Sequence, residues 1–303
     1  MKLEFLGTGN AFSKTKGPSC AVFSDGEFEI LIDAGEGVSP LVEQAINAGL
    51  FLKHKDAVNV AITHMHPDHV AGLGSLMYIL RYKYDVKHIN IFVGCEEHVT
   101  QIKNLLSIYD IDNRRVHGVF IHIFVCDTYT TISSSTTLGG ARKLVTETKM
   151  GMVPVEHDGR PCFGLIFVRN GYYENIVPKS TDTPEHISRT IIAYSGDTKE
   201  FFGDKLKELL TNVSHIACDI IVYHEASTVI TPVHTTLHEL VKSWIAFKSE
   251  YADSVSELYV YHVHDSMRTT QDLIRFVSVK FNPNKIDTDS VYLAESVILK
   301  EEE

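Results

Sequence analysis

The sequence has few features of a membrane or secreted protein. No apolar run approaches the roughly 18 to 20 residues that cross a bilayer, and a strand-like pattern starts at Lys2, which leaves no room for a signal peptide. An odd number of widely scattered cysteines, none in a Cys-x-x-Cys pair, fits reduced thiols and not a disulfide framework. They are Cys20, Cys95, Cys126, Cys162 and Cys218. We therefore expect a cytoplasmic protein that does not contact membranes.

Positive charge is also scarce. The chain has 28 Lys and Arg against 39 Asp and Glu, which gives a formal net charge of −11. A large nucleic-acid footprint normally appears as a basic face. Arg114-Arg115 and Arg142-Lys143 could contribute to such a face. The overall balance nevertheless argues against a polyanionic partner.

Ordinary globular composition accompanies these absences. The 303 residues are 44% hydrophobic and 22% charged, which is enough for a large core. Short β-type runs come first, followed by α/β alternation, a β-rich middle and renewed alternation. We predict one α/β domain over residues 1–303, in which residues 170–186 form a surface excursion and not a linker. Expected helices include residues 38–48, 68–84, 96–106, 199–210, 236–249 and 269–276; expected strands include 58–63, 89–93, 116–126, 143–148, 151–155, 162–168, 190–194, 220–223 and 258–262.

Histidine is the unusual component, with 16 copies, and four potential ligands fall within six residues. His64, His66, Asp68 and His69 directly follow the apolar run 58–62. Residues two apart in an extended segment point the same way, so His64 and His66 can converge on one ion. Imidazoles with a carboxylate suit zinc, whose catalytic sites leave a position for water. A solvated histidine-rich loop is the alternative, and the density of ligands argues against it.

This segment is the His-x-His-x-Asp-His hallmark of the metallo-β-lactamase superfamily, which the chain resembles along most of its length. Further matching motifs are Phe5-Leu6-Gly7-Thr8-Gly9, Asp33-Ala34-Gly35-Glu36, Ser195-Gly196-Asp197-Thr198 and His224-Glu225-Ala226. Their order resembles the tRNase Z branch and, within it, the small cyclic-nucleotide phosphodiesterases of the anti-Pycsar type. The resemblance implies an αββα sandwich with two divalent metal ions at one edge, zinc first and manganese as the alternative.

The resemblance also implies the remaining metal ligands. They would be His157, Asp197 as the residue shared by both ions, and His262, which join His64, His66, Asp68 and His69. Each has a simpler interpretation: His157 as a turn histidine, Asp197 as a helix cap, and His264 in place of His262. Asp33 would hold a ligand imidazole from behind or simply form a turn. Gly7-Thr8-Gly9 lacks a third glycine and predicts a tight turn near the site, not a dinucleotide loop.

Three residues are the catalytic candidates. His234, in Val233-His234-Thr235-Thr236, matches a His-Ser-Thr element of the tRNase Z branch and would protonate the leaving oxygen of a phosphodiester. Glu225 would hold that imidazole, and Asp68 would orient the attacking water as well as bind metal. The alternative for His234 is an ordinary histidine at the start of a helix. The helix expected from Asp68 would add its positive end to the anion site.

One departure from tRNase Z decides the expected substrate. Members that process tRNA carry a long arm with a Gly-Pro tip that grips the tRNA. In this chain the corresponding connection, residues 165–194, is short and contains no Gly-Pro pair. We therefore predict hydrolysis of cyclic mononucleotides, in the host cytoplasm if the gene belongs to a phage. The alternatives are tRNA 3′-end processing, a lactonase or thioesterase, and a non-catalytic binding module.

Two further expectations concern surfaces. The resemblance implies a homodimer, with which an apolar helix face of Leu73, Leu76, Met77 and Leu80 is compatible, although core packing explains that face equally well. The nucleotide base needs an apolar or aromatic wall, for which Tyr78, Tyr82 and Tyr84 are candidates.

Overall fold

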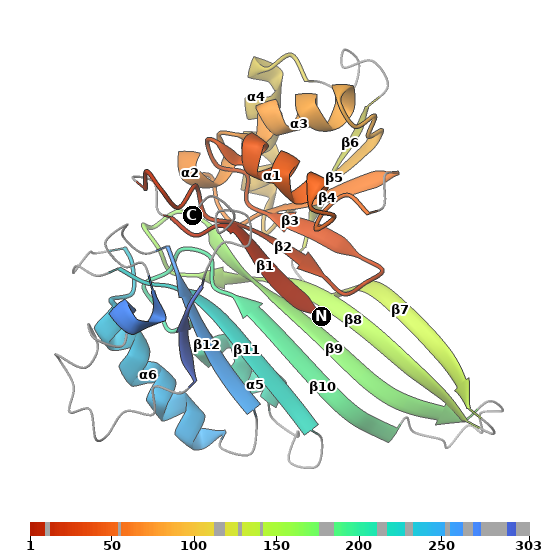
Figure 1. Ribbon diagram of the computed structural model, residues 1–303, viewed down its shortest axis with the longest axis vertical. Coiled ribbons are helices and arrows are strands. Elements are labelled where there is room, and N and C mark those ends of the chain that lie inside the picture. Colours follow the sequence, from red (N-terminus) through yellow and green to blue (C-terminus); the bar gives the residue numbers. More distant parts are fainter. Residues whose placement is uncertain are drawn as a thin grey trace.

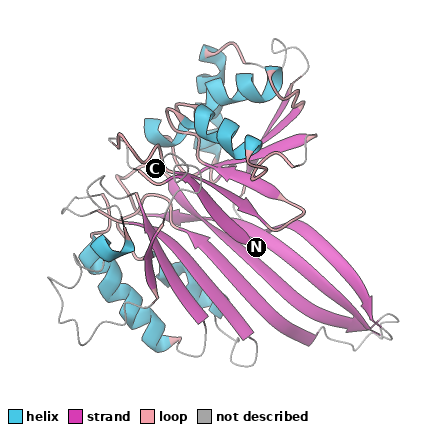
Figure 2. Ribbon diagram, viewed as in Figure 1, coloured by secondary structure: helices cyan, strands magenta, loops and turns pink. Residues whose placement is uncertain are grey.

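The computed structural model places two facing β-sheets between outer helices (Figures 1 and 2). It describes residues 1–9, 13–53, 56–111, 119–126, 129–139, 142–175, 185–210, 217–227, 233–251, 255–262, 269–273 and 290–294.

The first sheet is built in sequence order from six strands. The first two pairings are antiparallel and the next three are parallel. The strands are β1 (Lys2–Gly7), β2 (Cys20–Ser24), β3 (Glu29–Ile32), β4 (Ala57–Ile62), β5 (His88–Val93) and β6 (Phe120–Val125).

The second sheet has seven strands in the order β13-β12-β11-β10-β9-β8-β7. The pairings from β7 to β10 are antiparallel and those from β10 to β13 are parallel. As a result β8, β10, β11 and β12 run in one direction and end at the same edge. The strands are β7 (Thr130–Gly139), β8 (Arg142–Val155), β9 (Cys162–Asn175), β10 (Glu185–Tyr194), β11 (Ala217–Glu225), β12 (Val255–Tyr261) and β13 (Val291–Leu293).

Helices cover the outer face of each sheet (Figure 2). The first sheet carries α1 (Val38–Asn47), α3 (Leu73–Tyr82) and α4 (Glu96–Ile108), and the second carries η1 (Phe202–Leu206), α5 (Lys207–Leu210) and α6 (Leu237–Glu250). A third apolar cluster fills the space between the sheets, where the rings of Phe23 and Phe167 stack at 3.6 Å. The predicted αββα sandwich is confirmed, as a single α/β domain.

Several predicted elements differ from the observed ones. Residues 68–84 are two helices, α2 (Pro67–Val70) and α3, separated at Ala71 and Gly72. The break coincides with a close backbone approach, because a Cβ on Gly72 would lie 2.1 Å from the Gly35 carbonyl oxygen. With four residues, α2 is too short to supply the expected helix end for an anion. Residues 199–210 form η1 and α5 instead of one long helix.

The β-rich middle is also larger than predicted. The sequence did not predict strand β7, because Thr-Thr-Ile-Ser-Ser-Ser-Thr-Thr-Leu-Gly is mostly polar. In the part of the chain that the structure describes, β7 pairs with β8 alone. The expected surface excursion at 170–186 is wrong where the structure describes it, because β9 and β10 extend into it and pair at Tyr173 and Glu185. Arg114-Arg115 lies outside the described residues. Of the helix expected at 269–276, residues 270–273 are helical and residues 274–276 lie outside the described residues.

Expectations about disulfides, the apolar helix face and membrane contact can now be compared with the structure. All five cysteines are free thiols, which confirms the absence of disulfides. The face of Leu73, Leu76, Met77 and Leu80 is buried in the core, so it is not a dimer surface. Among the described helices, none is long and apolar enough to cross a membrane.

Candidate metal centre

The seven predicted ligand residues come together at one edge of the sandwich. Each follows the carboxyl end of a strand: the His64–His69 segment follows β4, His157 follows β8, Asp197 follows β10 and His262 follows β12. The common direction of β8, β10 and β12 explains why His157, Asp197 and His262, up to 105 positions apart in the sequence (157 to 262), meet here. Asp197 does not cap a helix, because η1 starts only at Phe202. His264 lies outside the described residues.

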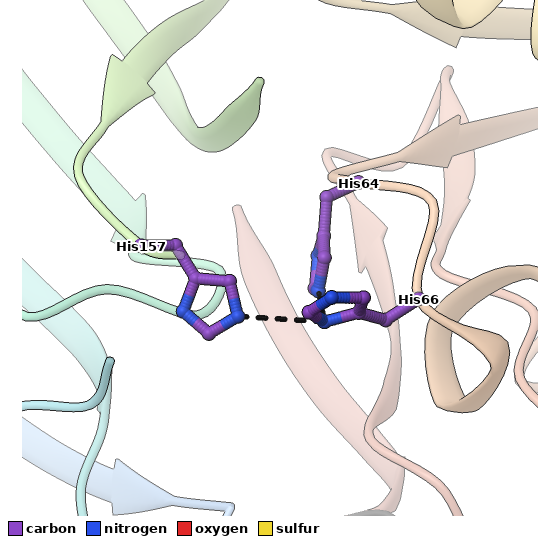
Figure 3. A group of neighbouring side chains, drawn as sticks. All are labelled: His64, His66 and His157. Carbon is purple, nitrogen blue, oxygen red and sulfur yellow. Dashed lines mark hydrogen bonds between the residues drawn. The ribbon is translucent and has the colours of Figure 1, made fainter. Parts of the chain in front are cut away.

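The first group consists of His64, His66 and His157 (Figure 3). His64 Nε2 lies 3.0 Å from His66 Nδ1, and His157 Nε2 lies 3.4 Å from the same atom. The opposite ring nitrogens are each occupied by an outer partner. His64 Nδ1 contacts the Thr63 hydroxyl at 3.1 Å, His66 Nε2 contacts Asp158 at 3.1 Å, and His157 Nδ1 contacts the Val233 carbonyl oxygen at 2.9 Å.

These outer contacts determine what the facing nitrogens can do. A neutral imidazole that donates its proton outward presents an unprotonated nitrogen on the other side. Donation to Val233 O and Asp158 therefore leaves His157 Nε2 and His66 Nδ1 as lone pairs directed at one another. Two facing lone pairs 3.4 Å apart repel each other unless a cation lies between them.

The second group consists of Asp68, His69, Asp197 and His262. His69 Nε2 lies 3.5 Å from one oxygen each of Asp68 and Asp197, and His262 Nδ1 lies 2.8 Å from Asp197 Oδ1. Asp197 also belongs to a cluster with His157, on the side of the first group, and His234. One carboxylate thus adjoins both groups of nitrogen atoms.

Unsatisfied buried atoms show that the second group fits a metal ion. His69 Nε2, Asp197 Oδ1 and His262 Nδ1 are buried and have no correctly oriented hydrogen-bond partner. The 2.8 Å approach of His262 to Asp197 is short, but its angles are not those of a hydrogen bond. A buried polar atom without a partner is costly. Nitrogen and carboxylate donors at these positions suit zinc.

Asp33 holds His69 from behind, as the sequence led us to expect. Its Oδ2 lies 2.8 Å from His69 Nδ1, and Thr63 donates to the carboxylate through its amide at 2.8 Å and its hydroxyl at 2.9 Å. Asp33 and His69 are fully buried. This contact directs His69 Nε2 at the second group and makes that nitrogen more basic.

The electrostatics of the two groups differ. Burial is the main influence that lowers the pKa values of His64 and His157, so both imidazoles are held neutral, the form that binds metal. Burial also lowers the pKa of His69, but Asp197 and Asp33 outweigh it and raise the pKa well above its ordinary value. The second group therefore favours a positive charge, which a divalent cation would supply.

Backbone geometry at the site is also unusual. Asp33 and His262 have positive φ angles of 63° and 59°, a conformation that non-glycine residues seldom adopt. The His262 amide donates to Thr8 O at 2.9 Å, which places the Gly7-Thr8-Gly9 segment beside the site. A Cβ on Gly35 would lie 1.8 Å from Asp68 O, so only glycine fits there. Such strain is typical of functional positions.

A third side-chain pair adjoins the two groups. His234 Nδ1 lies 3.1 Å from Glu225 Oε2 and 3.9 Å from Asp197 Oδ2. The buried Glu225 is fixed by the amides of Thr198 and Thr235, at 3.1 and 3.3 Å. Burial, the largest influence, lowers the pKa of His234, but the Glu225 hydrogen bond and the nearby carboxylates raise it above the ordinary value. His234 is thus positioned by Glu225, as predicted.

Sequence reasoning missed two features of the site. Asp158 contacts His66, and the available signal was its position directly after His157. A cavity of about 430 Å³ adjoins His64 and His66 and is lined further by Val70, Gln101, Asn104, Leu105 and Arg160 among others. The three tyrosines proposed as a wall, Tyr78, Tyr82 and Tyr84, do not line it. Tyr78 and Tyr82 are instead exposed.

Comparison with solved structures identifies the fold class. The metallo-β-lactamase fold protein YhfI from Bacillus subtilis matches with a TM-score of 0.58 at 15% identity, over 97% of this chain and 96% of that one. The αββα sandwich with its ligand edge is therefore the metallo-β-lactamase fold.

Sequence comparison identifies the family. The family model described as "Anti-Pycsar protein Apyc1" matches residues 1–279, so the chain belongs to the anti-Pycsar Apyc1 family and is a metal-dependent hydrolase. The Apyc1 protein of Paenibacillus sp. is 41% identical over 78 residues, 26% of this chain and 30% of that protein. Ribonuclease Z of Methanococcus maripaludis is 28% identical over 266 residues, 80% of each chain. The resemblance inferred from the motifs is thereby confirmed.

Proposed function

We propose that the protein hydrolyses cyclic mononucleotides to linear nucleoside monophosphates with a centre of two divalent metal ions. The observation that carries the proposal is the His234–Glu225 pair beside Asp197, which adjoins both ligand groups. Family membership supports it as well, since the family name refers to cyclic-nucleotide defence signalling. A lactonase or thioesterase would use similar ligand groups but would leave this pair without a role.

The geometry supports one assignment of the ligands. His64, His66 and His157 would hold one ion, and Asp68, His69 and His262 the other, with Asp197 between them. When bound, such ions polarise the phosphate and lower the pKa of water. Zinc fits the nitrogen-rich donors, with manganese as the alternative.

The side chains then divide the remaining chemistry. Asp68 lies 3.5 Å from His69 Nε2 and 3.7 Å from His262 Nε2, and its side chain is 16% exposed, so it can orient the attacking water. As the water oxygen bonds to phosphorus, the ester bond to the ribose oxygen breaks. His234 donates a proton to that leaving oxygen, and Glu225 stabilises the imidazolium before transfer. The product is a linear monophosphate.

The cavity beside His64 and His66 supports a small substrate. Its volume of about 430 Å³ is in the range of small-molecule sites. Its wall includes apolar side chains such as Val70 and Leu105 and the amides of Gln101 and Asn104. A nucleoside, with a flat apolar base and a polar edge, matches this lining.

Processing of tRNA 3′ ends is the second candidate, because ribonuclease Z proteins match most of the chain. Phosphate contacts dominate tRNA affinity, yet one of the basic side chains considered for them is already paired: Lys143 lies 2.8 Å from Glu174. This favours the small substrate.

The proposal is tested by incubating the purified protein with 3′,5′- and 2′,3′-cyclic nucleotides and separating the products by chromatography. We expect linear monophosphates, loss of turnover after chelation, and recovery near two equivalents of added zinc. Recovery at one equivalent would contradict the dinuclear centre. No turnover of any cyclic nucleotide by zinc-loaded protein would refute the proposed function.

A further inference from the structure

Among the described residues, two of the candidate ligand imidazoles form a hydrogen bond with a carboxylate that is itself outside the ligand set. His69 contacts Asp33, and His66 contacts Asp158, at 2.8 and 3.1 Å. The first contact belongs to the second group and is fully buried. The second belongs to the first group and is partly open to solvent, since the side chains of His66 and Asp158 are 24% and 18% exposed. Each proposed metal position thus has one imidazole held by a carboxylate.

Asp158 is held in place by the turn that contains it. Its Oδ1 accepts a hydrogen bond from the Arg160 amide at 3.1 Å, and Gly159 between them has a φ of 88°, which favours glycine. The turn therefore orients the carboxylate independently of His66. Its other oxygen, Oδ2, faces two groups at once: His66 Nε2 at 3.1 Å and Arg160 Nε at 3.1 Å.

We propose that Asp158 is a positioning residue for the first metal position, and that Arg160 weakens its action by sharing Oδ2. Donation from His66 Nε2–H to Asp158 fixes the ring so that Nδ1 faces His64 and His157. It also makes Nδ1 a stronger electron donor. The inference rests on the metal centre of the proposed function.

The shared oxygen predicts effects of opposite sign. The Arg160 guanidinium attracts negative charge at Oδ2, so its presence reduces the electron density that Asp158 passes to His66. Arg160 is 69% exposed and lines the cavity beside His66. Removal of Asp158 should therefore weaken zinc binding, and removal of Arg160 should strengthen it slightly.

Zinc titration of the chelator-stripped full-length protein against a chromogenic competitor tests this. In Asp158→Asn, the amide oxygen can still accept from the Arg160 amide, so the turn is preserved while the charge is lost. We expect one of two zinc affinities to fall about 10- to 100-fold, the usual effect of losing such a partner. The other affinity should change less than about threefold, within the spread of an exposed ion pair. Arg160→Ala should leave both affinities intact or tighten one by up to about fivefold, the range of an exposed ion pair.

Glu156→Gln is the matched control, because Glu156 lies in the same segment and its carboxylate pairs with Lys199. The zinc affinities of Glu156→Gln should equal those of the wild type. Every variant, in its metal-free form, should also have the same thermal midpoint of unfolding as the metal-free wild type. Unchanged affinities in Asp158→Asn, or a loss in Arg160→Ala equal to that in Asp158→Asn, would overturn the inference. If the wild type bound two zinc ions and cleaved cyclic nucleotides while Asp158→Asn bound equally well, only this inference would fail. If the wild type bound one ion, the dinuclear proposal would fail, and the affinity of that ion would still decide the role of Asp158.

Discussion

Replacement of His234 by alanine should slow phosphodiester hydrolysis without removing metal. His234 is outside the seven ligand candidates, and its contact is with Glu225 at 3.1 Å. Metal content measured by mass spectrometry should therefore equal that of the wild type. The loss should appear in kcat, because proton donation to the leaving oxygen matters only as the ester bond breaks.

The magnitude follows from the geometry. A hydrogen bond between charged groups contributes about 1.5–3 kcal/mol, or roughly 10- to 150-fold in rate when it forms only in the transition state. General-acid catalysis contributes about 10²- to 10⁴-fold. The Glu225 contact keeps the imidazole oriented, so we expect a kcat loss of about 10²-fold or more for nucleotide substrates. On a nitrophenyl ester, whose leaving group needs no proton, the kcat of His234→Ala should fall by less than about tenfold, which is below the range for general-acid catalysis.

The assay compares kcat and KM of the wild type and of His234→Ala, each on a cyclic nucleotide and on a nitrophenyl phosphodiester. His186→Ala is a suitable control, since this exposed histidine lies at the start of β10, opposite to the end that carries Asp197. Equal losses on the two substrates would refute proton donation by His234. A loss of bound metal in His234→Ala would instead assign this residue to the ligand set.

Three further predictions follow from the structure and the family. Asp197→Ala should abolish binding of both ions, because this carboxylate adjoins both ligand groups; retention of one tightly bound ion by mass spectrometry would contradict a shared role. Burial lowers the pKa of His224 to about 4, so the unfolded state binds a proton first as pH falls below 6.5. Folding stability should then drop by about 2 kcal/mol between pH 8 and 5, and denaturant titrations should show this drop reduced in His224→Gln. A homodimer, expected from the resemblance alone, should appear in sedimentation velocity at micromolar concentration, and a monomer would remove that expectation.

The fold and the local ligand motif were accessible from the sequence for a physical reason. His64, His66, Asp68 and His69 lie within one strand–helix connection, so their convergence follows from local geometry. Strands with continuous apolar runs, such as β4, were also recognised. The resemblance supplied the distant residues, which no local pattern could place.

What the sequence could not give depends on contacts between distant segments. The contact of His66 with Asp158 joins residues 92 positions apart, and it requires the end of β8 in one sheet to lie beside the end of β4 in the other. The break between α2 and α3 falls at Gly72, which weakens a helix only mildly by itself and approaches the Gly35 backbone closely in the fold. The polar strand β7 is stabilised by its pairing with β8 and lacks the apolar alternation that would predict a strand.

The most direct test of the central claim is a comparison of kcat/KM between cyclic mononucleotides and a tRNA that carries a 3′ trailer. Both substrates would be measured at the same zinc and salt concentrations, because salt strongly affects tRNA binding. We predict efficient conversion of at least one cyclic nucleotide to its linear monophosphate and negligible trailer removal. Efficient trailer removal with no turnover of any cyclic nucleotide would contradict the account and assign the chain to tRNA processing.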